Sequence, residues 1–362
     1  MRFEILSEYD GDWSGQIHIS ALSFSMQNLG KIIWNGLNGS FKIVLNQNKF
    51  KHAKAETTIG SINIQVDPLN ESIKEFAIQP IKYRYDVTKS SGLLSANTNT
   101  YTPQIAITTL TNKKLIIDKF AIHTAFSMDQ VTLYNANISI NARDIKTSDK
   151  TISTISPFHF TLTTSNFSTE GLEDYLNNLN STNTTKNFQT IDFKILEGLL
   201  VHTITPISII HGNIMLDTPS GAFTCNYKSN WRANVPAPNT FADIIASADI
   251  KFSVIISPSL AIKIIELYDG TLVVANTSQG KIAILKHKPA VQPLQNNNTL
   301  NKSTLPLPQT DISYISSETP QQLIDELLLG GFIDKDNNNN YISVITIESG
   351  VWKMNGTPVY SQ

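Results

Sequence analysis

Two features of this 362-residue chain have residue types that could do chemistry: an acidic, asparagine-rich run and seven scattered histidines. In the run, Asp334, Asp336 and Asn338 place side-chain oxygens at alternate positions, as a calcium-binding loop does. The sixth position is Asn339 instead of glycine, and the twelfth is Ile345 instead of a bidentate glutamate. Because the ligand set is incomplete, we predict no metal site, and the calcium interpretation comes second to that of a solvated turn.

The histidines show no pair at the i, i+4 spacing of a helical zinc site. His18, His123 and His159 lie in alternating segments, where a half-buried, hydrogen-bonded histidine is expected. The single cysteine, Cys225, allows no intramolecular disulfide and no thiolate cluster. The sequence contains no nucleophile elbow, P-loop or dinucleotide-binding fingerprint. We therefore predict no cofactor and no catalytic residue, and we keep a hydrolase with dispersed catalytic residues as an alternative.

Composition excludes one class of partner. Charged residues make up 16% of the chain and the formal net charge is −2, with no dense cluster of lysine and arginine. A nucleic-acid-binding protein normally carries such a basic patch, so we predict no nucleic-acid partner. No run of about 18 apolar residues is present, and the first residues do not have the pattern of a signal peptide.

Alternating hydrophobicity indicates strands along most of the chain. From Val131 to Ala142 the period is two, which places Tyr134, Ile138 and Ile140 on one face of a strand. Such segments recur every 10–20 residues between Gly, Asn and Pro. We predict an α+β, mostly antiparallel β protein, with elongated curved sheets and a few short helices.

Short helices are expected where capping residues precede an apolar stripe. Ser168 and Thr169 precede one such stripe. Near the C-terminus Thr319 can cap, Pro320 suits the first helical position, and Gly330 can end the helix. The segment 193–205 is ambiguous between a buried strand pair and a short helix.

These patterns divide the chain into four regions. Residues 1–165 form an N-terminal β-rich region, and residues 166–288 form a central β-rich region with short helices. Residues 289–311 are rich in proline and asparagine, which indicates a linker or long loop. Residues 312–362 form a helix-plus-strands element that we expect to dock on the main sheet.

The C-terminal element also carries a family resemblance. Its features are the sequence Leu-Leu-Gly-Gly-Phe at 328–332, Tyr341 opening a strand, Glu-Ser-Gly at 348–350, and Asn-Gly-Thr-Pro at 355–358. With looser matches upstream, the chain resembles the YdgA-like family of bacterial proteins, which are built around a domain of unknown function. The resemblance implies the periplasm or cell envelope, with membrane association only through an N-terminal anchor, which we do not expect within these 362 residues. The alternative localisation is cytoplasmic. The resemblance implies no catalytic residues.

The apolar strand faces suggest the function. If few helices cover a long sheet, part of one face stays open and could bind an acyl chain or another hydrophobic ligand. Candidate ligand residues are Tyr134, Ile138, Ile140, Phe158 and Phe160, and the alternative is that they pack under the short helices. We predict a non-catalytic envelope protein that binds a lipid or other hydrophobic ligand, or an envelope protein partner, along a concave β surface. A protein–protein interaction module is a further alternative.

Overall fold

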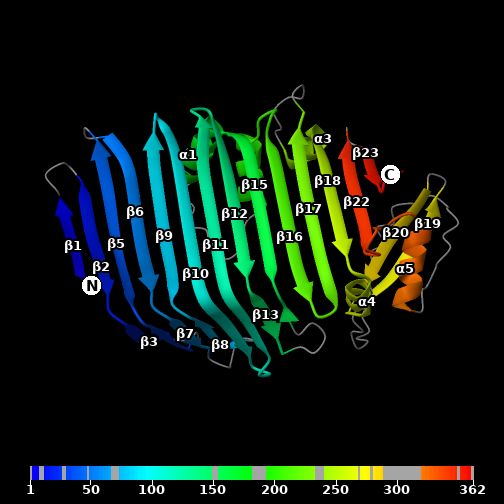
Figure 1. The fold of residues 1–362 in the computed structure, drawn as a ribbon, viewed down its shortest axis with the longest axis horizontal. Helices are drawn as coiled ribbons and strands as arrows, with labels where there is room; N and C mark the ends of the chain where they lie inside the picture. The colour runs from blue at the N-terminus through cyan, green and yellow to red at the C-terminus, as the bar shows by residue number, and fades with distance from the viewer. Residues whose placement is uncertain are drawn as a thin grey trace, which may run out of the picture.

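A long, open antiparallel sheet dominates the fold (Figure 1). The computed structural model describes residues 2–7, 12–26, 30–46, 49–66, 73–148, 154–181, 193–232, 240–267, 270–277, 280–287, 319–348 and 351–359. In Figure 1 few helices cover the sheet: short helices lie behind its upper part and at one end. The predicted class, α+β with mostly antiparallel strands, is confirmed.

The strands of the N-terminal half are β1 (Arg2–Ser7), β2 (Trp13–Ile19), β3 (Leu22–Met26), β4 (Gly30–Trp34), β5 (Leu37–Asn46), β6 (Lys49–Ile59), β7 (Ile62–Gln65), β8 (Ile73–Ile78), β9 (Ile81–Ser90), β10 (Leu93–Thr109), β11 (Lys114–Gln130), β12 (Leu133–Ala142), β13 (Asp144–Thr147) and β14 (Thr154–Ile155). Those that follow are β15 (Phe158–Ser168), β16 (Ile209–Thr218), β17 (Gly221–Trp231), β18 (Ala248–Ile256), β19 (Gly270–Thr277), β20 (Gly280–His287), β21 (Asp334–Lys335), β22 (Tyr341–Glu348), β23 (Val351–Met354) and β24 (Thr357–Val359).

The main array follows chain order with a few skips. Its strands lie side by side as β1, β2, β5, β6, β9, β10, β11, β12, β15, β16, β17, β18, β22, β23 and β24. All of these pairs are antiparallel, so hairpins and short connections join most neighbours. Strands β19 and β20 form a separate two-stranded sheet.

Strands β10 and β11 are the longest and carry a second, lower arm. The upper half of β10 pairs with β9 and its lower half with β8, while β11 pairs first with β13 and then with β12. The change of partner on β10 occurs near Thr102, whose buried hydroxyl donates to the carbonyl oxygen of Gln79 at 3.0 Å. On β11 it occurs near Lys119, which has a positive φ of 51°. Strands β8, β7, β4 and β3 extend the lower arm.

The helices are α1 (Thr169–Ser181), α2 (Phe193–Thr203), α3 (Phe241–Ser247), α4 (Pro258–Leu267) and α5 (Pro320–Leu329). Helix α1 begins where Ser168 Oγ accepts from the backbone N–H of Gly171 at 3.0 Å, as the capping signal predicts. Helix α5 begins with a capping box between Thr319 and Gln322 and ends at two glycines. The ambiguous segment 193–205 is mainly helical.

The main core lies between the sheet and α1–α3. It contains Tyr134, Phe167, Ile204, Ile210, Trp231, Ile244, Ala248, Ile250 and Ile347, with Leu200 and Val201 of α2 packed against them. A smaller core between α4, α5 and β22 contains Ala261, Ile324 and Tyr341.

The four-region division stays a prediction. The boundary at 165/166 falls inside β15, and the sheet continues across it. The predicted linker, 289–311, lies outside the described residues. In the C-terminal region, β22 pairs with β18 from Tyr341 to Ile347.

Candidate functional site

Side chains alternate across each strand, so the sheet has two chemically different faces. On β12, Ile138 and Ile140 point to one face and Ser139 to the other. Directly opposed residues on neighbouring strands share a face, so the register extends this division over the sheet. We call the face with Ile138 the apolar face and the face with Ser139 the polar face.

The apolar face carries no charged side chain over the central described strands. Two adjacent rows cross β12, β15, β16, β17 and β18 in direct register. They consist of Ile140, Phe160, Ile214, Cys225 and Val254, and of Ile138, Leu162, Gly212, Tyr227 and Phe252.

Helices α1–α3 cover only the upper part of this face (Figure 1). Tyr134 lies under them, 7% exposed, and its ring stacks on Phe126 with centroids 5.2 Å apart. Burial raises the pKa of the Tyr134 phenol. Lower on the face, two large apolar side chains of the same row are exposed: Ile138 is 38% exposed and Phe252 is 40% exposed.

The five candidate ligand residues therefore divide into two groups. Ile140 lies directly opposite Phe160, and Phe158 lies opposite Ala142, so four of the five gather on the lower part of the apolar face. Ile140, Phe158 and Phe160 are half-buried there. Tyr134 is on the same face, but it belongs to the core beneath the helices. A ligand role for any of them stays a prediction.

The polar face is built from cross-strand hydrogen bonds. The Nδ1–H of His18 donates to Asn38 Oδ1 at 2.6 Å, and that of His123 donates to Asn99 Oδ1 at 2.8 Å. His159 and Asn141 form the same pair. The two residues of each pair are directly opposed, so each histidine links neighbouring strands through a side-chain hydrogen bond.

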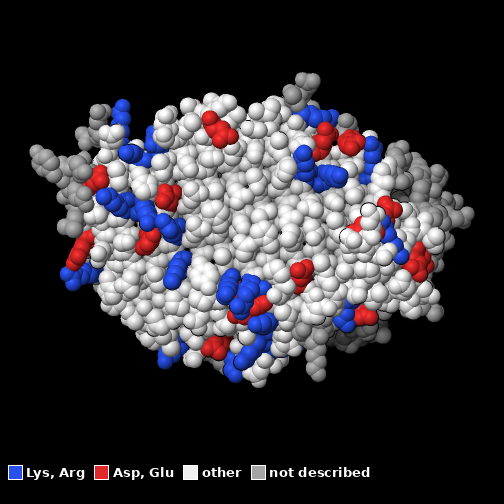
Figure 2. All heavy atoms as spheres, in the orientation of Figure 1, with Lys and Arg blue, Asp and Glu red and all other residues white. Residues whose placement is uncertain are grey.

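One row on this face is polar across eleven consecutive strands, from β2 to β18. Its members are Gln16, Ser40, Glu56, Arg84, Asn99, His123, Ser139, Thr161, Asn213, Asn226 and Ser253. Figure 2 shows the face turned away from helices α1–α3: charged side chains gather toward its two ends and lower margin, and few lie over β12, β15 and β16.

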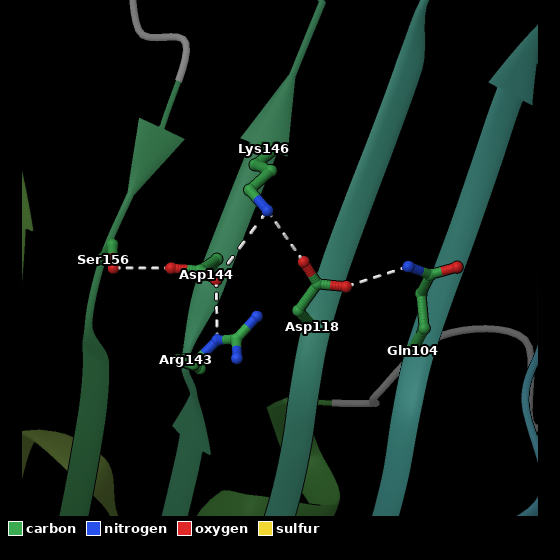
Figure 3. Close-up of polar contacts among 6 residues, drawn as sticks. All are labelled: Gln104, Asp118, Arg143, Asp144, Lys146 and Ser156. Carbon is green, nitrogen blue, oxygen red and sulfur yellow. Dashed lines mark hydrogen bonds and ion pairs between the residues drawn. The ribbon is translucent and has the colours of Figure 1, made fainter.

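A connected cluster of charged residues lies on β11 and β13 (Figure 3), and β13 is in the lower part of the sheet in Figure 1. Asp118 is directly opposite Asp144, and the Lys146 ammonium bridges them, 3.0 Å from one carboxylate and 3.8 Å from the other. Gln104 Nε2 donates to Asp118 at 2.9 Å, and Ser156 Oγ donates to Asp144 at 2.6 Å.

These contacts favour the ionised forms of Asp118, Asp144 and Lys146. The Gln104 hydrogen bond and then Lys146 lower the pKa of Asp118. The Ser156 and Arg143 hydrogen bonds lower the pKa of Asp144, and Asp118 raises the pKa of Lys146. A glycosidase needs one carboxyl with a raised pKa to act as acid. The cluster therefore joins β10, β11 and β13 to Ser156, which follows β14, and has no acid–base asymmetry.

A histidine and a carboxylate also meet at His52 and Asp86, with Nε2 and Oδ1 3.1 Å apart. Both lie on neighbouring strands β6 and β9. Neither side chain lines the 600 Å³ groove that crosses these strands. The hydrolase alternative gains no support from this pair.

The candidate calcium run forms a turn between β21 and β22. Asp336 Oδ1 accepts from the backbone N–H groups of Asn338 and Asn340, both at 2.8 Å, and its Oδ2 accepts from the Asn340 amide at 3.0 Å. The Asn340 side chain is the main cause of the lowered pKa of Asp336. Both oxygens already have partners within the turn. The described residues contain no group of three or more histidine, cysteine or carboxylate side chains that could hold a metal ion.

A family model described as "Bacterial protein of unknown function (DUF945)" matches residues 2–361. The chain belongs to this family. This confirms the resemblance to YdgA-like proteins, because YdgA is itself a DUF945 member. No curated protein and no solved structure matches the DUF945 chain. In the part of the chain that the structure describes, no helix has the length and apolarity needed to cross a membrane.

Sequence reasoning missed the long polar row of this DUF945 chain and the Asp118 cluster. Both depend on which residues lie opposite each other on paired strands that are separated in the sequence, and alternation within one strand does not determine this register. The available signal was weak: Asn141 stands between Ile140 and Ala142, and His123 follows Ile122, but Asn99 stands between two threonines.

Proposed function

We propose that this DUF945 chain is a non-catalytic binding protein of the bacterial cell envelope, and that the apolar face holds the acyl chain of a lipid. The observation that supports this most is the exposure of Ile138 and Phe252 within an uncharged row of the sheet. Large side chains of this kind are normally covered, and exposed groups of them indicate an interaction site. Ile138 and Phe252 lie at the two ends of the row, and the residues between them are half-buried.

The shape of the row favours an elongated ligand. From β12 to β18 the row crosses four strand-to-strand steps, which at about 4.8 Å each give a length of roughly 19 Å. No charged group on this part of the face would have to be desolvated beneath a hydrocarbon chain. An acyl chain lying across the strands would contact Ile138, Leu162 and Phe252 in turn.

The envelope location rests on the family resemblance, since related proteins with this domain are expected in the periplasm. It is tested separately, by fractionating cells of the native host and probing for the protein. Recovery with cytoplasmic markers would contradict the location without affecting lipid binding.

Lipid binding is tested by native mass spectrometry of the protein purified from its host without detergent, and by titration with a fluorescent fatty acid. We expect a bound lipid mass and saturable uptake. Ile138→Gln should weaken uptake about tenfold, because it places an amide under the hydrocarbon chain. A ligand-free spectrum together with no uptake in vitro would overturn the proposal.

The matched control is Met215→Gln. Met215 is 45% exposed and lies on the polar face, opposite His159. The substitution therefore removes an apolar side chain of similar exposure from the other face of the sheet. Uptake should stay at the wild-type level. Equal losses in the two variants would show that the probe does not bind on the apolar face.

A further inference from the structure

Two lysines and a histidine lie in direct register on the polar face, at the end of the sheet near β18. His211 on β16 is opposite Lys228 on β17, and Lys228 is opposite Lys251 on β18. All three side chains are exposed. Directly opposed like charges are destabilising in a sheet, so an anion bound between them would stabilise this arrangement.

The same row contains a second lysine pair that is compensated. Lys42 on β5 is opposite Lys54 on β6, near the other end of the sheet. There, Lys42 lies 3.5 Å from Asp12, and Lys54 lies 3.0 Å from Glu56. Within the described residues, Lys228 and Lys251 form no such ion pair.

Nearby carboxylates on the described strands are engaged elsewhere. Asp249, next but one to Lys251, pairs with Arg232 at 3.8 Å. Glu348 pairs with Lys353 at 2.6 Å. The Lys228–Lys251 pair therefore contributes two positive charges that these carboxylates leave uncompensated.

These residues line a groove of 500 Å³ on the polar face. Its walls combine the two lysines and His211 with uncharged hydrogen-bonding side chains, among them Thr163, Asn213 and Asn226. Asn213 Nδ2 donates to Asn226 Oδ1 at 2.7 Å, which fixes both amides between the strands. Figure 2 shows lysine and arginine side chains over β17 and β18, beside the uncharged middle of the face.

We infer that this groove binds a phosphate group carried on a hydroxyl-rich molecule. A phosphate with close to two negative charges at neutral pH balances the two lysines, and its oxygens accept from their ammonium groups and from His211. The amide and hydroxyl side chains of the groove then have sugar-like hydroxyls as partners. The site lies on the face opposite the proposed lipid surface, and its failure or success is independent of lipid binding.

Calorimetric titrations with inorganic phosphate, glucose 6-phosphate and glucose test the inference, in buffers matched in ionic strength with chloride. We expect phosphate to bind, glucose 6-phosphate to bind more tightly, and glucose alone to give no measurable heat. The double variant Lys228→Gln with Lys251→Gln should lose at least about tenfold in affinity for both phosphates, since two charge-assisted contacts are removed.

The double variant Lys42→Gln with Lys54→Gln is the matched control, and it should bind both phosphates as the wild type does. A second readout is the backbone amide NMR signals: those of residues 211, 228 and 251 should move on addition of phosphate, and those of 42 and 54 should not. Equal losses of affinity in the two double variants, or no binding by the wild type, would overturn the inference. Equal affinity for inorganic phosphate and glucose 6-phosphate would overturn the part that concerns the hydroxyl-rich body.

Discussion

Ile140 lies directly opposite Phe160 on neighbouring strands, and both side chains stand half-buried on a face that carries no charge over the central strands. In the adjacent row toward helices α1–α3, Leu162 packs against the main core and Ile138 is 38% exposed, so the cover of the helices ends within that row. The proposed lipid surface begins at this boundary.

Fatty acids of increasing length should therefore bind with increasing affinity. Each additional methylene buried on the apolar face contributes about 0.8 kcal/mol, or roughly a fourfold change in Kd. Displacement of a fluorescent fatty acid by saturated competitors measures the series. An affinity that does not vary with chain length would show that the hydrocarbon chain does not lie on the protein.

Asp118→Asn should alter the response to acid. The pKa of Asp118 is lowered, so its contribution to stability is present above its ordinary pKa of 3.8 and is lost as the pH falls through the lowered value. In the variant, Lys146 loses a partner, and Tm at neutral pH should fall by about 2 °C. Between pH 4 and pH 2 the Tm of the variant should fall less steeply than that of the wild type.

The control for this prediction is Glu348→Gln, which breaks the more exposed ion pair with Lys353. It should leave Tm at neutral pH within about 1 °C of the wild type. An unchanged acid profile in Asp118→Asn would mean that the cluster does not contribute to stability through this carboxylate.

Gly171→Ala should force α1 away from α2. A β-carbon at Gly171 would lie 1.8 Å from the carbonyl oxygen of His202, and this contact is with backbone, so it cannot be relieved by a rotamer change. We expect the free energy of unfolding to fall by about 3 kcal/mol, the upper range for overpacking, as measured by urea denaturation. Gly212→Ala, whose added β-carbon has no neighbour nearer than 3.5 Å, should cost much less.

Phe167→Ala and Phe160→Ala should differ in their effect on stability, because Phe167 lies in the core and Phe160 lies on the open part of the apolar face. Phe167 is 2% exposed and packs with Tyr134, so its truncation should lower the free energy of unfolding by about 3–5 kcal/mol. Phe160 is only half-buried, and its truncation should cost less than half as much. Similar losses at the two sites would show that the lower part of the face is as well covered as the core.

Deleting residues 309–362 should cause aggregation. The deletion removes β22, which pairs with β18, and with it Ile347, which is 3% exposed in the main core beside Trp231 and Ile250. Light scattering after purification measures the outcome. A soluble fragment that unfolds cooperatively would instead show that the C-terminal element is an appendage.

Local patterns in the sequence were sufficient to predict several elements. The alternation of Ile138 and Ile140 with Ser139 predicts β12, and Thr319 with Pro320 predicts the start of α5. These predictions succeed because a strand face and a helix cap are determined by residues within a few positions of each other.

Helix α2 and the surface sites could not be predicted in this way. In segment 193–205 the apolar run suits either a strand or a helix, and packing of Leu200 and Val201 on the sheet decides for the helix. Lys228 faces Lys251, and Asp118 meets Lys146, only because of the register of the strands. The candidate ligand residues were predicted as a group because their own strands alternate, but the burial of Tyr134 depends on helices elsewhere in the chain.

The order of the strands in space has a consequence for how the protein folds during its synthesis. Strands β10, β11 and β12 each pair with the strand synthesised just before them, and so do β16, β17 and β18. The pairings from β9 to β12 and that of β16 with β17 close short loops, whose entropic cost is small. Helices α1 and α2 lie between β15 and β16, and α3 lies between β17 and β18. The sheet can therefore grow by one strand at a time as the chain emerges, each hairpin using the previous one as its template. The pairing of β22 with β18 spans a longer stretch of chain and has to wait until the C-terminal strands have been made.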